Sequence, residues 1–313
     1  MSFATETKNE LARVWPPKKC CQLAEIAGFL RVSGSIRLAG GGKFKIVITT
    51  DNPAVARHYK KLIQEYFRID TELAIGEAQA LKTGHTYILT IDPAMRSESI
   101  LRETGILLVR EGNNYLSDGI YDGIIRTKCC RKAYLRGIFL GAGTITHPKK
   151  GYHLEFLCRT ETLARDLRKL INTFDDLSAR LSTRKDKHIV YMKSAQYISD
   201  TLAIMGAHSK MLELEDVRIS KELVNEATRL TNCDNANTDR ALDASQKQIE
   251  AIRKIDESCG INALPDKLRE LAILRQLNPE ANLTQLGEML SPPLKKSGVN
   301  NRMKRILDFA SRL

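Results

Sequence analysis

The segment Leu23–Gly34, LAEIAGFLRVSG, has apolar side chains at helical spacing and a glycine near its middle. A similar segment, Ala133–Gly143, AYLRGIFLGAG, follows later in the chain. Gly28 and Gly137 take the same place in the two segments and lie 109 residues apart. A repeat of this kind indicates that one structural unit occurs twice in the chain. The sequence therefore predicts two structurally equivalent halves.

The elements after each glycine-containing helix repeat as well. Runs of β-branched and aromatic residues predict strands, and apolar residues at a 3.6-residue period predict helices. The first half is expected to contain strands at 44–50, 73–75 and 85–91 and helices at 52–67 and 97–107. The second half is expected to contain strands at 152–158 and 189–192 and helices at 161–174 and 196–205. We expect an α+β domain at 20–207, with half-repeats at about 20–107 and 129–207, preceded by an N-terminal helix or arm at 1–19.

Each repeated helix has a face with almost no side-chain bulk. Ala24 and Gly28 lie on one such face, and Ala133 and Gly137 lie on the other. Helix axes approach most closely where the side chains between them are smallest. We therefore expect these four residues to form the interface of a helix pair that joins the two halves.

The duplicated motif resembles that of the LAGLIDADG homing endonuclease fold. Its two copies are Ile26–Gly34, IAGFLRVSG, and Leu135–Gly143, LRGIFLGAG, and the resemblance covers about residues 20–207. It implies a pair of motif helices above two saddle-shaped sheets that lie on DNA. A sheet surface able to bind DNA is one expectation that follows.

At the positions where LAGLIDADG endonucleases have catalytic acids, this chain has other residues. The resemblance implies a carboxylate just before the last glycine of each motif, where it holds a divalent metal for phosphodiester hydrolysis. Ser33 and Ala142 occupy these positions, and Arg31 and Leu140 lie two residues earlier. None of these side chains replaces a carboxylate as a ligand for a hard cation. We therefore expect no enzymatic activity, no catalytic metal and no cofactor.

The charge favours a polyanionic partner. The net charge is +12 and the isoelectric point is near 9.4, which is typical of proteins that bind nucleic acid. Residues 210–313 hold 17 basic and 16 acidic side chains, so the first 209 residues carry most of the excess. Two interpretations are open for a set of basic residues in the first 209 positions: they form a sheet face that binds DNA, or they form a solvated basic surface. The residues are Lys43, Lys45, Arg57, Lys149, Lys150, Arg159, Arg184, Lys185 and Lys187.

The seven cysteines form no recognisable disulfide or metal pattern. Their number is odd and they include two adjacent pairs, which fits a reducing compartment. No Cys-x-x-Cys spacing occurs, so we interpret the cysteines as small buried hydrophobic residues. The sequence also lacks an apolar run of 18 residues and a secretory signal pattern. We expect a cytoplasmic protein without a membrane partner.

The segment at 208–244 is predicted to be a helical linker. Its polar residues leave only a narrow apolar stripe, and the helix is expected to break near 232–238, where several asparagines occur. Either a hinge or a linking helix fits this pattern. The asparagine cluster is polar enough to contact nucleic acid, although such clusters more often form turns and caps.

The C-terminal domain, 245–313, is predicted to contain a helix-turn-helix. Helices are expected at 245–258, 265–277, 283–290 and from about 297, with a break at Ser291-Pro292-Pro293. The last two helices resemble the DNA-binding helix-turn-helix of sigma factor region 4. A buried stripe at Val299, Met303, Ile306 and Ala310 leaves an outer face that either contacts DNA or is the basic solvent-exposed face of an amphipathic helix. The expected DNA-binding residues are Lys295, Lys296, Ser297, Asn300, Asn301, Arg302, Lys304 and Arg305.

The whole chain resembles the WhiA family. The resemblance is carried by SFATETKNELAR at 2–13, by the Asn232-Cys233 region and by ANLTQLGEMLSPPLKKSGVNNRMKRI at 281–306. It implies a nucleoid-associated regulator that binds double-stranded DNA and controls transcription in sporulation or cell division of a Gram-positive bacterium. A scaffold for another transcription regulator or for a chromosome-segregation factor is the alternative.

Overall fold

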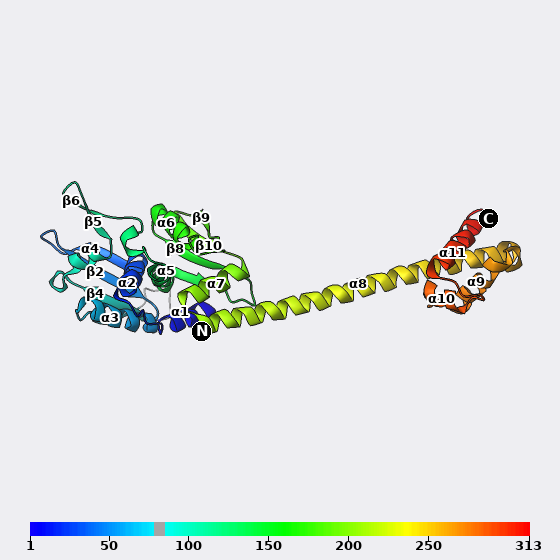
Figure 1. Ribbon diagram of the computed structural model, residues 1–313, viewed down its shortest axis with the longest axis horizontal. Helices are drawn as coiled ribbons and strands as arrows, with labels where there is room; N and C mark the ends of the chain where they lie inside the picture. Colours follow the sequence, from blue (N-terminus) through cyan, green and yellow to red (C-terminus); the bar gives the residue numbers. More distant parts are fainter. Residues whose placement is uncertain (78–84) are drawn as a thin grey trace. The chain divides into compact units, whose positions relative to one another are not determined.

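The computed structural model describes residues 1–77 and 85–313 (Figure 1). The chain divides into two compact units, Met1–Ser220 and Lys221–Leu313, each with its own hydrophobic core. The division falls inside helix α8 (His208–Cys259) and within the predicted linker at 208–244.

The first half of unit 1 is built around a four-stranded antiparallel sheet. The strand order is β1-β2-β4-β3, and the small hairpin β5-β6 follows it. The elements are α2 (Lys19–Ser33), β1 (Gly34–Leu38), β2 (Phe44–Thr50), α3 (Pro53–Phe67), β3 (Glu72–Glu77), β4 (His85–Ile91), η1 (Pro93–Met95), α4 (Ser97–Glu103), β5 (Leu107–Arg110) and β6 (Asn113–Leu116).

The second half repeats this arrangement. Its sheet has the order β7-β8-β10-β9, which places its strands as β1, β2, β4 and β3 are placed in the first sheet. Its elements are η2 (Asp122–Ile124), α5 (Lys128–Ala142), β7 (Gly143–Ile145), β8 (Leu154–Cys158), α6 (Glu161–Ile171), β9 (Arg180–Arg184), β10 (Lys187–Met192) and α7 (Ala195–Met205). The predicted duplication and the α+β class are therefore confirmed.

Several elements differ from the sequence prediction. Strands β1, β7 and β9 and the hairpin β5-β6 were not expected, because they are short and several are rich in polar residues. The predicted helix at 97–107 ends at Glu103. It ends there because Gly105 adopts a left-handed conformation, with φ of 65°, and Leu107 already pairs with Leu116 in the hairpin.

Helices α2 and α5 contact each other backbone to backbone. A Cβ atom placed on Gly28 would lie 2.4 Å from the carbonyl oxygen of Tyr134, and one placed on Gly137 would lie 2.2 Å from that of Glu25. Ala24 on α2 and Ala133 on α5 are buried. Any side chain at either glycine would force the helices apart, so the small-residue faces set the distance between the two halves.

A buried ionic network crosses the same interface. The carboxylate of Glu25 is fully buried and accepts hydrogen bonds from Nε and Nη2 of Arg136, at 2.8 and 2.6 Å. Its other oxygen lies 2.7 Å from Nε2 of His58 on α3. Arg136 also donates to the carbonyl of Met205, at 2.9 Å. Three helices of the first unit and the end of α7 are thus connected through one carboxylate.

The N-terminal residues belong to the first unit. Phe3 and Leu11 of α1 (Phe3–Leu11) are buried in its core. The carboxylate of Glu10 accepts hydrogen bonds from the backbone amides of Ser209 and Lys210, at 2.7 and 3.1 Å. Residues 1–19, expected as a separate helix or arm, therefore pack on the domain and stabilise the start of α8.

Unit 2 is all-helical and has a small core of its own. It contains the end of α8, η3 (Ile261–Ala263), α9 (Asp266–Leu277), α10 (Leu283–Met289) and α11 (Lys296–Ser311). Ile252 and Ile255 of α8 pack with Leu271, Leu286 and Met303 of the other three helices. Lys254 donates a hydrogen bond to the carbonyl of Ala310 at 3.1 Å, which ties α8 to the end of α11.

The expected break near 232–238 is wrong. Helix α8 runs through these residues without interruption. The segment contains no glycine or proline, which are the residues that break helices most strongly. The hydroxyls of Thr231 and Thr238 donate to the carbonyls of Ala227 and Asp234, one turn earlier, so the polar side chains are accommodated within the helix.

Replacement of Gly137 by alanine should destabilise unit 1. The added methyl group meets backbone atoms that cannot rotate away, and overpacking of this kind costs about 1–3 kcal/mol. Trp15 is the single tryptophan and lies against His58, so its fluorescence during urea unfolding reports this unit. Gly76→Ala is the control in the same unit, because a Cβ there first meets the terminal methyl group of the Ile88 side chain, at 3.3 Å, which can move aside. Equal midpoints for Gly137→Ala and the unchanged chain would contradict the backbone contact.

The substitution Glu25→Gln should also lower the free energy of unfolding of unit 1. Glutamine keeps the shape of the side chain but leaves the Arg136 guanidinium buried without a counter-charge. This should lower the free energy of unfolding by about 3–5 kcal/mol. Glu98→Gln is the matched control, since Glu98 pairs with Arg102 at the surface and such pairs contribute about 1 kcal/mol at most. Urea unfolding measures both variants. Similar effects of the two substitutions would show that the buried network is not essential.

Candidate nucleic-acid interface

The helix-turn-helix is formed by α10 and α11. Asn282 caps α10 by accepting hydrogen bonds from the amides of Thr284 and Gln285, and Gln285 returns a bond to the amide of Asn282. The Asn282 amide thus donates to the side-chain oxygen of Gln285, while the Asn282 side chain accepts from the Gln285 amide. This reciprocal pair is a capping box, and it fixes the start of the helix.

The connection between the two helices packs tightly against α10. The amide of Leu294 donates to the carbonyl of Gly287 at 2.9 Å. A Cβ on Gly287 would lie 2.2 Å from the carbonyl oxygen of Leu294. The connection is longer than the usual three-residue turn, but this close approach to the glycine brings α11 back against α10.

Helix α11 has one buried and one exposed face. Val299, Met303, Ile306 and Ala310 are buried, as the sequence predicted. The exposed side chains on the opposite face form what we call the recognition face: Ser297, Asn300, Asn301, Lys304 and Arg305. Lys295 and Lys296 are exposed at the N-terminal end of the helix.

Arg302 lies differently from the other candidate residues. It is half-buried, and its Nη1 donates to the carbonyl of Lys267 on α9 at 3.2 Å. The sequence assigns Arg302 to a phosphate contact, whereas in the structure its guanidinium connects α11 to α9. A phosphate contact by Arg302 stays a prediction.

The recognition face has the chemistry required to contact DNA. An asparagine side chain can bond bidentately to adenine, and a lysine can bond to guanine or to phosphate. In helix-turn-helix proteins the N-terminal residues of the second helix contact the base edges. Asn300 and Asn301 occur in the second turn of α11 and are exposed, so both amides are accessible to a base pair.

The C-terminal ends of the motif helices in unit 1 carry no acid at the family positions. Ser33 is buried, and a Cβ on Gly141 would lie 2.5 Å from its hydroxyl oxygen, so Ser33 packs directly against α5. Arg31 donates to the carbonyls of Gly105, at 3.0 Å, and Ser117. Ser33 thus serves helix packing, Ala142 is partly buried against the core, and the guanidinium of Arg31 binds backbone carbonyls.

The basic residues considered for a sheet face come from strands, from helix α3 and from the segments between elements. Lys45, Arg184 and Lys187 alternate with core residues of their strands and therefore point away from the core. Lys45 pairs with Asp92 at 2.9 Å. Arg159 is exposed but donates to the carbonyl of Gly34 at 2.7 Å. The others lie elsewhere: Arg57 is on α3, and Lys43, Lys149, Lys150 and Lys185 lie between elements.

The outward faces also carry two arginines that the sequence analysis missed. Arg37 on β1 lies opposite Lys45 in the sheet register, and Arg180 on β9 lies opposite Tyr191. Both occur in strands that were not predicted. Recognition of β1 and β9 would have placed them on the outward faces by the alternation of side chains along a strand.

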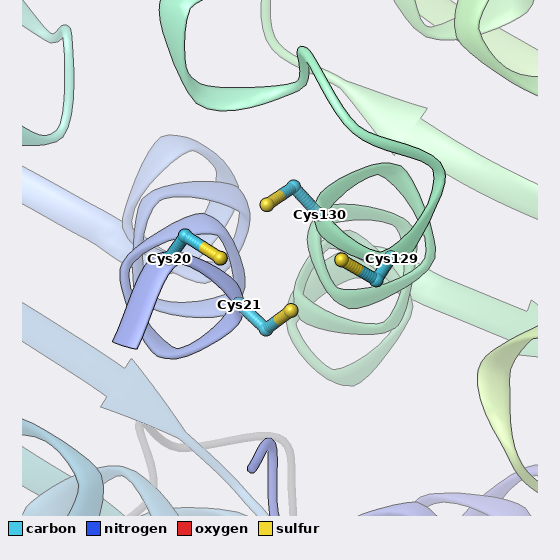
Figure 2. Close-up of side chains that lie close together, drawn as sticks. All are labelled: Cys20, Cys21, Cys129 and Cys130. Carbon is cyan, nitrogen blue, oxygen red and sulfur yellow. The ribbon is translucent and has the colours of Figure 1, made fainter. Parts of the chain in front are cut away.

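Four cysteines form a cluster that the sequence analysis also missed. Cys20 and Cys21 lie in the first turn of α2, and Cys129 and Cys130 lie in the first turn of α5. All four sulfur atoms lie within 4.8 Å of one another, and Figure 2 shows the side chains pointing toward each other between the helix ends. The pairs are 109 residues apart, and this shared offset was the available signal.

The environment of the cluster favours a thiolate at one position. The hydrogen bond with the Thr127 hydroxyl, followed by one with Cys21, lowers the pKa of the Cys129 thiol to about 7. Burial raises the pKa of the Cys130 thiol. Cys20 is exposed, so the cluster is open to solvent on one side.

In the parts of the chain that the structure describes, no helix is both long and apolar enough to span a membrane. Three family models match the chain: the WhiA N-terminal LAGLIDADG-like domain at 19–107, the WhiA LAGLIDADG-like domain at 131–224 and the WhiA C-terminal HTH domain at 227–310.

The chain is similar to whole proteins as well. A relative from Alkaliphilus metalliredigens is 42% identical over 312 residues, covering 100% of this chain and 98% of the relative. One from Thermoanaerobacter pseudethanolicus is 41% identical over 313 residues, with the same coverage. Both are named "Probable cell division protein WhiA".

The similarity extends to a solved structure. The crystal structure of full-length WhiA from Thermatoga maritima matches 100% of this chain and 99% of its own, with a TM-score of 0.61 and 25% identity. With its duplicated LAGLIDADG-like helices, its C-terminal helix-turn-helix and full-length relatives at about 40% identity, this chain belongs to the WhiA family.

Proposed function

We propose that this protein is a DNA-binding transcription regulator whose helix α11 reads double-stranded DNA. The observation that carries the proposal is the recognition face, where amide and basic side chains are exposed opposite the buried stripe of α11. The names of the relatives refer to cell division, so we propose that the genes it controls act in cell division or sporulation. A regulator of this kind would be associated with the nucleoid.

The LAGLIDADG-like domain is proposed to be inactive as a nuclease. Hydrolysis by hard divalent metals requires carboxylate ligands, and Ser33 and Ala142 occupy the positions of these acids. Glu25, the acid within motif helix α2, is already bonded to Arg136 and His58. Among the described residues, the group of three or more side chains close enough to share an ion consists of cysteines.

A role as a protein-interaction scaffold is the second candidate. On the outward face of the second sheet, Leu157 lies directly opposite Ile189 in the strand register, and Leu157 is 43% exposed. Apolar side chains on an exposed sheet face suit a protein partner better than a phosphate backbone. This domain would then bind another regulator while α11 binds DNA.

The substitution Lys304→Ala should weaken DNA binding. Loss of one contact to a base or phosphate costs about 1–3 kcal/mol, or roughly 10- to 100-fold in affinity. Fluorescence anisotropy with a fragment selected from genomic DNA by the full chain measures this. Lys247→Ala is the matched control, because it removes the same charge from an exposed position on α8. Equal affinities for the two variants would argue against the recognition face.

The full chain should leave bound DNA intact in the presence of Mg²⁺ or Mn²⁺. The reason is the lack of a carboxylate at positions 33 and 142. The measurement is gel analysis of a supercoiled plasmid that carries the selected fragment, over a range of metal concentrations. Site-specific nicking that requires the metal and disappears with a chelator would contradict an inactive domain.

A further inference from the structure

The cysteine cluster has a geometry that calls for an explanation beyond packing. Cys158 is buried as an isolated small hydrophobic residue, as free cysteines commonly are. The four clustered cysteines differ, because Cys20 is exposed and Cys129 is half-buried. Burial of apolar surface therefore does not account for four thiols that converge from two helices at the surface of the domain.

We propose that Cys20, Cys21, Cys129 and Cys130 bind one Zn²⁺ ion. Structural zinc sites with four cysteines are tetrahedral with Zn–S distances of about 2.3 Å, which sets the sulfur atoms about 3.8 Å apart. The four sulfur atoms already lie within 4.8 Å of one another. Side-chain rotations that move the sulfur atoms by about an ångström would bring them to the spacing of a zinc site.

The number and spacing of the thiols favour a single ion over other thiol chemistry. A disulfide uses two sulfur atoms and does not need the other pair nearby. In an iron–sulfur cluster the four cysteines are shared among two or four iron atoms, so that cysteines on different irons lie farther apart than the sulfur atoms of this cluster. Soft thiolate ligands in tetrahedral geometry are typical of zinc.

The electrostatic surroundings suit the negative charge of a tetrathiolate site. All four cysteines lie in the first turns of α2 and α5, where the exposed amides and the helix dipoles favour anions. Lys18 and Lys19 precede the first pair and Lys128 precedes the second. Basic residues therefore adjoin both cysteine pairs along the chain, although Lys128 also lies 3.6 Å from the carboxylate of Asp175.

The zinc ion would join α2 and α5 at their N-terminal ends, whereas positions 33 and 142 lie at the C-terminal ends. Ser33 and Ala142 end α2 and α5, whereas the cysteines begin them. The two ligand pairs come from different half-repeats, so the ion would cross-link the halves. Because zinc binds thiolates, binding releases thiol protons and stabilises the folded state that holds the ligands together.

Metal binding to the reduced full chain tests this proposal. Chain stripped of metal is titrated with Co²⁺, whose tetrahedral thiolate complexes absorb strongly in the visible range, and then with Zn²⁺. We expect one Co²⁺ per chain, its displacement by one Zn²⁺, and a rise in the midpoint of unfolding followed by Trp15 fluorescence. X-ray absorption of the zinc-loaded chain should show a sulfur shell at about 2.3 Å.

Paired serine variants identify the ligands. Cys20→Ser combined with Cys129→Ser, the two less buried members, should lose stoichiometric binding and the stabilisation by zinc. Cys233→Ser combined with Cys259→Ser is the matched control, because both residues are exposed and lie outside the cluster. If the first variant fails to fold, the Co²⁺ titration and the X-ray absorption of the unchanged chain still show whether four sulfur atoms bind the metal. Absence of a sulfur shell, or equal zinc binding by both double variants, would overturn the proposal.

Discussion

The close packing of helices α2 and α5 at Gly28 and Gly137 holds the two halves of the first unit together. Each glycine lies against backbone atoms of the opposite helix, so α2 and α5 can approach closely enough for Glu25 to reach Arg136. Each helix leads directly into the first strand of its own sheet. The spacing of two helices thereby determines where both sheets begin and where the cysteines of the two halves meet.

The same helix pair separates what packing requires from what nuclease chemistry requires. Packing requires small residues along the crossing, whereas hydrolysis requires acids at the helix ends. This chain keeps the first requirement at Gly28 and Gly137 and has Ser33 and Ala142 at the second. In the proposed function, base recognition belongs instead to α11, whose fold depends on a separate core.

The sequence predicted the features that depend on periodicity. The duplication followed from equally spaced glycines, and the buried stripe of α11 followed from apolar residues at helical spacing. Short strands such as β1 and β9 were missed, because a few polar residues carry little periodic signal and tertiary pairing decides their structure. The cysteine cluster was missed for a related reason: its ligands are adjacent in pairs, and only the packing of α2 on α5 brings the pairs together.

Photo-cross-linking of the full chain to its selected DNA tests whether α11 provides the main contact with DNA. The DNA carries photoreactive bases, and mass spectrometry identifies the attached peptides. We predict cross-links concentrated within residues 295–305, with Asn300, Asn301 and Lys304 among them. Cross-links confined to the outward faces of β1-β2 or β8-β10 would contradict the account and assign DNA binding to the LAGLIDADG-like domain.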